Sequence, residues 1–154
     1  MKIKAIVFAL AVILAGVSLA SAQDPNMGTW KLNEAKSKFG KGATKNHTVV
    51  YEAAGDDIKV IVDGTDASGA ATHNEWTGKF NGRFYPVTGD PSSDTRAYRR
   101  INRSTLSITG KKGSKVSLTG TITVARGGKV RTVTTSSRNA AGRWVSSTAV
   151  YDKQ

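Results

Sequence analysis

The feature that most constrains this chain is a regular alternation of short β-type segments with glycine-rich turns. Segments dense in Val, Ile, Thr, Tyr and Trp are separated by stretches that contain Gly, Asn, Asp or Pro, such as Asn81-Gly82 and Gly127-Gly128. After residue 22, no stretch has the apolar spacing of a helix longer than one turn. The pattern predicts an all-β fold of about ten strands, at residues 28–33, 47–52, 58–63, 70–80, 83–87, 95–101, 105–109, 115–125, 129–137 and 143–152.

The first 22 residues have the pattern of an export signal. Lys2 and Lys4 precede an apolar run over residues 5–19, and Ala20-Ser21-Ala22 supplies a small-x-small cleavage pattern. The run is short for a membrane helix, which needs ~20 predominantly apolar residues, so we favour cleavage before Gln23 over an uncleaved anchor. We expect a signal peptide at 1–22, one domain at 23–154, no transmembrane segment after cleavage, and a periplasmic or secreted protein.

Cysteine is absent, which excludes disulfides and thiolate chemistry and, in an exported domain, favours a bacterial periplasm. The formal net charge of +12 attracts anionic partners. Most of the charges are dispersed singly along strands and turns, where they protect sheet edges and maintain solubility. No helix, zinc motif or RNA-binding signature accompanies them, so we expect no nucleic-acid partner. The one dense basic cluster consists of Arg96, Arg99, Arg100 and Arg103.

The short links favour hairpins between consecutive strands. A long antiparallel meander removes its exposed edges most simply by closing into an up-and-down barrel. A two-sheet sandwich is the alternative, but it needs crossover connections that few of these links can make. Asn81-Gly82 predicts a type I′ turn, and Pro86 places the segment 83–87 at an edge or beside a bulge.

The side-chain alternation describes the interior of such a barrel. Val116, Leu118, Ile122 and Val124 alternate with Ser and Thr, which predicts that these four side chains share one apolar strand face. Residues 132–137 are mostly Thr and Ser on both faces. Because side chains cannot fill a barrel of about ten strands, we expect a partly polar, hydrated cavity.

Two terminal segments resemble the calycin superfamily. Gly28-Thr29-Trp30-Lys31-Leu32 resembles the Gly-x-Trp opening of lipocalins and, more closely, the Gly-Thr-Trp-Lys-Leu opening of intracellular fatty-acid-binding proteins. Val150-Tyr151-Asp152-Lys153 is similar to the end of the last strand in that family. With Tyr85-Pro86-Val87-Thr88-Gly89, both segments also resemble a group of uncharacterised exported bacterial proteins. The resemblance implies a lipocalin-like barrel whose first and last strands pair.

Two differences restrict what the fatty-acid-binding family implies. That family inserts a helical pair as a lid after its first strand, and residues 34–45 are too few to form one, so we expect a lidless barrel. It also binds the fatty-acid carboxylate with an Arg-x-Tyr on the last strand. Those positions hold Ala149 and Tyr151 here, so a ligand would be held differently.

Trp30 is expected to close one end of the barrel, because its ring can fill the space between the first and last strands. A guanidinium from a late strand can stack on that ring, and Arg138 and Arg143 are the candidates. An ordinary core tryptophan with no arginine over it is the alternative.

Four amphipathic rings, those of Tyr51, Trp76, Tyr98 and Tyr151, are of the kind that lines ligand cavities, or alternatively covers a core. Arg99 and Arg138 are the candidates for an inward cation, although the outward orientation is favoured for each, because a slip of one residue reverses every assignment of strand faces. The candidate ligand-binding residues are Tyr51, Trp76, Arg99, Arg138 and Tyr151.

Catalytic and metal chemistry find little support in the sequence. His73 and Glu75 share one strand face, and His47 lies on a neighbouring strand, but a solvated polar face is the favoured interpretation and we expect no metal or cofactor. Most acidic residues occupy turns, and there is no Gly-x-Ser-x-Gly elbow. Gly127-Gly128-Lys129 lacks the spacing of a phosphate loop and predicts a hairpin turn. We expect no enzyme.

We therefore expect an exported, monomeric, non-catalytic protein that binds a small amphipathic or anionic ligand in the barrel. One alternative is a basic surface that binds envelope polyanions or a secreted protein, for example as an inhibitor. The other alternative is a structural envelope protein without a ligand.

Overall fold

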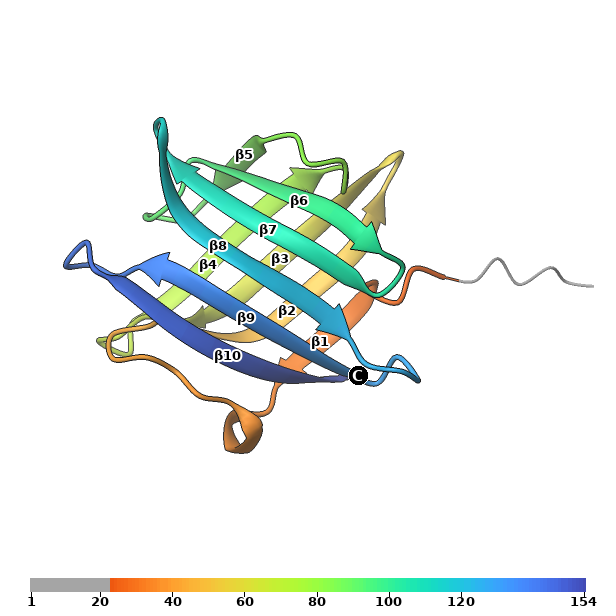
Figure 1. Ribbon diagram of the computed structural model, residues 1–154, viewed down its shortest axis with the longest axis horizontal. Coiled ribbons are helices and arrows are strands. Elements are labelled where there is room, and N and C mark those ends of the chain that lie inside the picture. Colours follow the sequence, from red (N-terminus) through yellow and green to blue (C-terminus); the bar gives the residue numbers. More distant parts are fainter. Residues whose placement is uncertain (1–22) are drawn as a thin grey trace, which may run out of the picture.

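The computed structural model describes residues 23–154, so the predicted signal peptide lies outside the described residues. Ten antiparallel strands form one closed barrel in the order β1-β10-β9-β8-β7-β6-β5-β4-β3-β2 (Figure 1). The strands are β1 (Gly28–Leu32), β2 (Lys45–Ala54), β3 (Asp57–Thr65), β4 (Ala71–Gly78), β5 (Tyr85–Thr88), β6 (Thr95–Asn102), β7 (Thr105–Lys112), β8 (Lys115–Val124), β9 (Val130–Arg138) and β10 (Trp144–Lys153).

Closure of the barrel through its first and last strands is confirmed. In β1, Trp30 lies opposite Lys153 of β10, and Leu32 lies opposite Tyr151. This pairing satisfies backbone groups that an open sheet would leave exposed at its margins. The all-β class, the strand number and the antiparallel meander agree with the sequence-based prediction.

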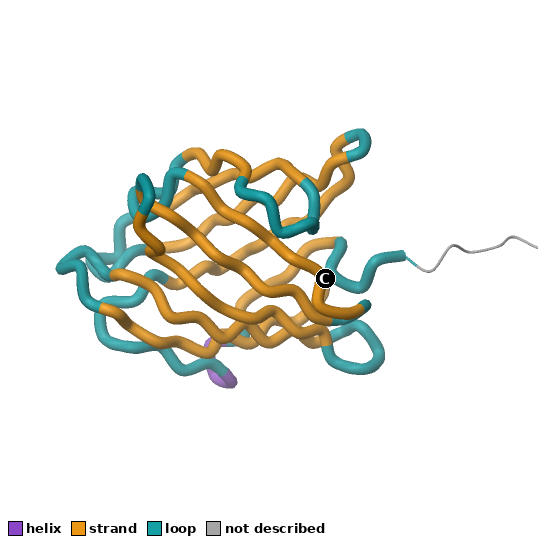
Figure 2. The backbone as a smooth tube through the Cα atoms, turned by 45° about the horizontal axis from the view of Figure 1, so that its top comes forward, coloured by secondary structure: helices purple, strands orange, loops and turns teal. Residues whose placement is uncertain are grey.

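Helical structure is confined, within residues 23–154, to the 3-10 turn η1 (Glu34–Lys36), which Asn33 caps by accepting a hydrogen bond from the Lys36 backbone N–H. No helical lid follows β1, as expected. Among the described residues, no helix has the length and apolarity required to span a membrane. The loops gather at two opposite ends of the barrel (Figure 2).

One end is covered by residues 23–27, and we call it the plugged end. The side chain of Asn26 is fully buried there, and the backbone carbonyl oxygen of Asn26 accepts a 2.8 Å hydrogen bond from Trp30 Nε1. Asp24 forms an ion pair with Arg100, and Lys153 Nζ donates to the Pro25 carbonyl oxygen at 3.4 Å. In Figure 1 this end lies to the right, beside the C-terminus. Residues 23–27 therefore connect β1, β6 and β10.

Aromatic rings fill the core near the plugged end. Trp76 contacts Tyr98 edge-on with ring centroids 4.6 Å apart and stacks on Phe80 at 6.4 Å. Tyr51 lies 6.3 Å from Tyr98. Each buried ring stabilises the fold by about 1.5–3 kcal/mol through loss of apolar surface to water.

The predicted type I′ turn at Asn81-Gly82 is wrong. Such a turn needs a positive φ at both residues, and only Gly82 has one, of 80°. Asn81 instead pairs with Arg99 of β6, and the Gly82 N–H donates to the Tyr98 carbonyl oxygen. The loop that contains Asn81 and Gly82 thus runs along β6. β5 pairs with β4 and with β6 at only two positions each. Pro86 has no N–H to donate to a neighbouring strand.

The predicted apolar face of residues 116–124 is interrupted. The register between β7 and β8 shifts at Gly110/Lys111, which inserts Ser117 as an extra residue. Ser117 is consequently buried, whereas Val116 is 40% exposed. Leu118, Ile122 and Val124 keep the predicted inward face.

Candidate functional site

The interior contains a buried arginine that sequence reasoning did not select. Arg131 of β9 is 1% exposed, and its guanidinium carbon lies 4.8 Å from the ring centroid of Trp30, 5.0 Å from that of Tyr51 and 4.8 Å from that of Tyr151. β9 and β1 are not adjacent, since β10 lies between them. Inside the barrel, the guanidinium therefore contacts rings on three other strands, β1, β2 and β10. These cation–π contacts hold it in place.

Arg131 has no carboxylate partner within 4.0 Å among the described residues. Its Nε and Nη1 atoms are buried without a hydrogen-bond acceptor. Burial of an N–H group without an acceptor costs about 1–3 kcal/mol, and more for a charged group. The aromatic contacts offset part of this cost, because a desolvated cation–π contact contributes about 2 kcal/mol. The guanidinium of Arg131 therefore has two nitrogens without acceptors and no carboxylate partner among residues 23–154.

Burial also acts on the two tyrosines in contact with Arg131. It raises the pKa of Tyr151 to about 12, and the positive charge of Arg131 only partly opposes the shift. Burial raises the pKa of Tyr51 as well, and the neighbouring Tyr98 adds to that effect. Both phenols remain neutral at ordinary pH, so neither supplies a counter-charge to Arg131.

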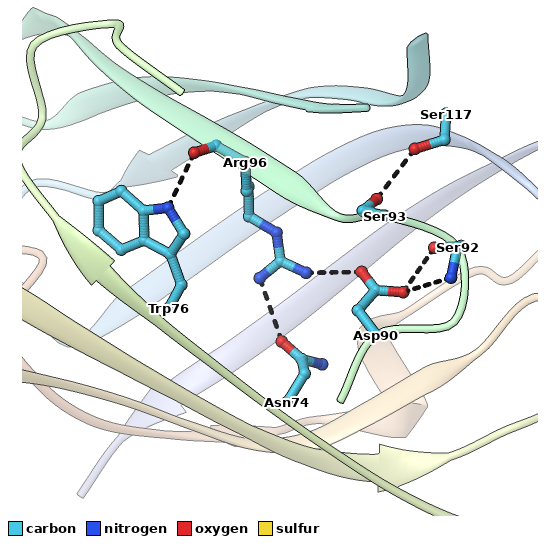
Figure 3. Close-up of polar contacts among 7 residues, drawn as sticks. All are labelled: Asn74, Trp76, Asp90, Ser92, Ser93, Arg96 and Ser117. Atoms are coloured by element: carbon cyan, nitrogen blue, oxygen red, sulfur yellow. Dashed lines mark hydrogen bonds and ion pairs between the residues drawn. The ribbon is translucent and has the colours of Figure 1, made fainter. Parts of the chain in front are cut away.

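A second buried arginine, Arg96 of β6, lies in a polar network (Figure 3). Its Nη2 contacts Asp90 Oδ2 at 2.9 Å, and its Nη1 donates to Asn74 Oδ1 at 3.1 Å. The Trp76 indole N–H donates to the Arg96 carbonyl oxygen at 2.8 Å. Because the Arg96 and Asp90 side chains are only 6% and 12% exposed, this is a buried, compensated ion pair.

The same network fixes the loop between β5 and β6. Asp90 Oδ1 accepts hydrogen bonds from the backbone N–H and hydroxyl of Ser92. The Ser93 hydroxyl lies 2.9 Å from that of Ser117, which joins the loop to β8. Arg96 is therefore paired with a carboxylate and fixes this loop, whereas Arg131 has no carboxylate partner among residues 23–154.

Inward-facing side chains differ between the two ends of the barrel. Strand alternation from Trp76 and Arg131 places Thr72, Asn74, Thr135 and Ser137 on the inner wall. We call this region the polar end. These four residues are only partly buried, whereas those around the plugged end are almost fully buried. Water therefore reaches the inner wall at the polar end, in agreement with the predicted partly polar interior.

The structure divides the predicted ligand-binding residues into two groups. Tyr51, Trp76 and Tyr151 are buried on the inner wall, at 3%, 1% and 3% exposure. Tyr98 is buried there too. Their part in ligand binding stays a prediction.

Arg99 and Arg138, the candidates for an inward cation, both have the outward orientation that was favoured for each. Arg99 follows the inward Tyr98 directly, and Arg138 lies seven residues after the inward Arg131 on an unbroken strand, so both occupy the outer face and are exposed. Arg138 instead stacks 4.6 Å from the ring centroid of the exposed Trp144 and donates to the Gly142 carbonyl oxygen.

The cation over Trp30 is thus Arg131, and the predicted partners Arg138 and Arg143 are wrong. Lys153 adds a second cation at 5.1 Å from the same ring centroid. A cross-strand signal was present in the sequence: Arg131 lies opposite Tyr151 in β9–β10 and opposite Val124 in β8–β9. Had the hairpin registers been known, the inward parity of Val124 would have identified Arg131.

The structure brings neither the basic cluster nor the two histidines together on one surface. Of the arginine cluster, Arg96 points into the barrel, so the four residues do not share one surface. His73 hydrogen-bonds Asp63 at 2.6 Å and lies 3.4 Å from Glu75. His47 is instead 2.9 Å from the Thr65 hydroxyl. Within residues 23–154, no group of three potential ligands could hold a metal ion.

The chain matches no protein-family model and no curated protein sequence. It is similar to a solved structure described as "Structure of EF1p2_mFAP2b bound to DFHBI", with a TM-score of 0.51 and 11% sequence identity. The match covers 84% of this chain and 94% of that one. At this identity the similarity concerns the fold alone, which here is a closed ten-stranded antiparallel barrel.

Proposed function

We propose that the protein is an exported, non-catalytic binding protein that holds a small amphipathic anion inside its barrel. The observation that carries this proposal is Arg131: a fully buried cation with no carboxylate within 4.0 Å among the described residues and two N–H-bearing nitrogens without acceptors. An oxyanion beside the guanidinium would supply the missing charge and the missing hydrogen-bond acceptors.

The remaining inner wall supports an amphipathic ligand. Val49, Val62 and Ala149 are buried apolar residues between Arg131 and the polar end. Thr72, whose Oγ1 is buried without a hydrogen-bond partner, and Thr135 belong to the polar end. A ligand entering there would pass polar groups and then apolar groups before its charged group met Arg131.

The structural neighbour supports the proposal only at the level of the fold. Its description names EF1p2_mFAP2b bound to DFHBI. A similar fold can enclose a small molecule, but ligand identity depends on the residues that line the site. The absence of the Arg-x-Tyr pair at Ala149 and Tyr151 separates this site from the resemblance to fatty-acid-binding proteins.

The first test is native mass spectrometry of protein recovered from a bacterial periplasm, with a bound anionic molecule as the expected result. The second uses 8-anilinonaphthalene-1-sulfonate, an amphipathic sulfonate, as a fluorescent probe. Arg131→Met should weaken probe binding about tenfold, since a hydrogen-bonded charge contact contributes about 1.5–3 kcal/mol.

Arg138→Met is the matched control, because Arg138 also stacks on a tryptophan but lies on the outer face. It should leave the interior affinity unchanged. A bare protein mass, combined with equal probe binding by both variants, would contradict the proposal.

A further inference from the structure

A concave groove of about 770 Å³ lies on the outside of the plugged end. Four basic residues line it: Arg103 from the β6–β7 hairpin, Arg126 and Lys129 from the β8–β9 turn, and Lys153 at the end of β10. They come from three separate segments, which the barrel brings together beside residues 23–25. The sequence cluster around Arg96–Arg103 contributes only Arg103.

Six Lys and Arg side chains among residues 23–154 form ion pairs with carboxylates, and the four groove cations are not among them. Elsewhere on the surface, Lys59 pairs with Glu75 at 2.9 Å and Lys112 pairs with Asp94 at 2.7 Å. None of the four groove cations has a carboxylate oxygen within 4.0 Å among the described residues.

The acidic side chain in the groove does not change this balance. Asp24 is the one acidic side chain of the lining, and it is engaged by Arg100 and by the Asn26 backbone N–H. Four cationic side chains against this one carboxylate leave an excess of positive charge.

The backbone holds the cations close together. Gly127 and Gly128 have φ values of 96° and 73°, and the Gly128 N–H donates to the Ala125 carbonyl oxygen at 3.0 Å, so the turn is tight. Arg126 and Lys129 flank that glycine pair. Lys153 is fixed by its contact with Trp30 and by its hydrogen bond to the Pro25 carbonyl oxygen. Like charges held in a concave site repel one another and favour a bound anion.

We propose that this groove binds a phosphate-type anion, either a soluble polyphosphate or the phosphate head group of a lipid. Guanidinium groups bind phosphate oxygens through paired N–H donors, and ammonium groups add point charges. The site lies outside the barrel and uses none of the interior residues, so it is independent of the ligand proposed for Arg131.

The test measures tripolyphosphate binding to the purified protein by calorimetry, at low salt and at about 0.15 M salt. The double variant Arg126→Gln/Lys129→Gln should bind about tenfold more weakly, as expected for loss of two exposed charge contacts. Arg143→Gln/Lys115→Gln removes the same charge from exposed sites elsewhere and should retain binding. Circular dichroism should show an intact barrel in both.

Vesicles of phosphatidylcholine, with and without phosphatidylglycerol, distinguish the two sources. Binding to the anionic vesicles that the groove variant alone loses identifies a lipid head group, and tripolyphosphate binding without vesicle binding identifies a soluble anion. Either result supports the groove. Equal weakening by both double variants, or absence of binding to both probes at low salt, overturns it. Arg131→Met should leave both readouts unchanged, which separates this proposal from the interior one.

Discussion

The guanidinium carbon of Arg131 lies 4.8 Å from the ring centroid of Trp30, although β10 separates the strands that carry them. The contact joins the first strand to the penultimate one inside the barrel. It also fixes the position of a buried charge whose other neighbours are the rings of Tyr51 and Tyr151.

Two replacements of Arg131 should distinguish the contribution of side-chain packing to stability from the contribution of the charge. Arg131→Ala should lower the free energy of unfolding by about 3 kcal/mol, because it leaves a cavity among three rings. Arg131→Met should change it by less than about 1 kcal/mol, since removal of an unpaired buried charge offsets the lost cation–π contacts. Urea denaturation followed by tryptophan fluorescence measures both. An equal cost for the two variants would show that charge, not volume, dominates.

The buried pair of Arg96 and Asp90 should be sensitive to loss of one partner. Asp90→Ala leaves the Arg96 guanidinium uncompensated and should cost about 3 kcal/mol. Glu34→Ala breaks the exposed pair with Lys45 and should leave the denaturation midpoint nearly unchanged. Similar midpoints for the two variants would mean that the Arg96 network does not stabilise the fold.

Stability should fall at alkaline pH. Burial raises the pKa of Tyr151 to about 12 and also raises the pKa of Tyr51, whereas both titrate near about 10 in the unfolded chain. The unfolded state therefore loses these protons first. The stabilising contribution is complete below about pH 10 and declines as the pH rises toward the folded values. Urea midpoints at about pH 9 and about pH 11, with phenolate absorbance, test this. Equal midpoints would count against buried phenols.

His73 should titrate above its ordinary range. Its hydrogen bond to Asp63 raises the pKa, and Glu75 contributes further, whereas desolvation opposes the shift. Asp63→Asn should lower the pKa in an NMR titration. The contribution to stability is complete below the unfolded pKa of about 6.5 and declines as the pH rises through the folded pKa. A titration that Asp63→Asn leaves unaltered would exclude the hydrogen bond between Asp63 and the His73 ring as the cause of the shift.

The irregularity in β8 gives opposite expectations for two adjacent residues. Ser117→Val should cost about 1–3 kcal/mol, since it leaves the buried Ser93 hydroxyl without its partner. Val116→Ser should change stability by less than about 0.5 kcal/mol, because Val116 is largely exposed. If urea denaturation showed a larger loss of stability for Val116→Ser than for Ser117→Val, the uninterrupted alternation predicted from the sequence would be correct.

Local sequence patterns were sufficient to predict the strands, and the resemblance at the two terminal segments predicted the closure of the barrel. β-branched runs end at glycine turns, and each strand is short enough to be recognised from its own residues. The pairing of β1 with β10 was indicated by Trp30 and Tyr151 through the resemblance, and the burial of Tyr51 and Trp76 follows from their size and apolarity.

Which arginine points inward depended on the tertiary structure. Arg131 and Arg138 lie on one strand and have the same chemistry, yet their odd separation sends one to the core and the other to solvent. Ser117 and Val116 exchange faces because the shift at Gly110/Lys111 offsets the pairing. A residue's own side chain determines whether it can form a strand, but its face depends on register, which is set by hydrogen bonds to partners distant in sequence.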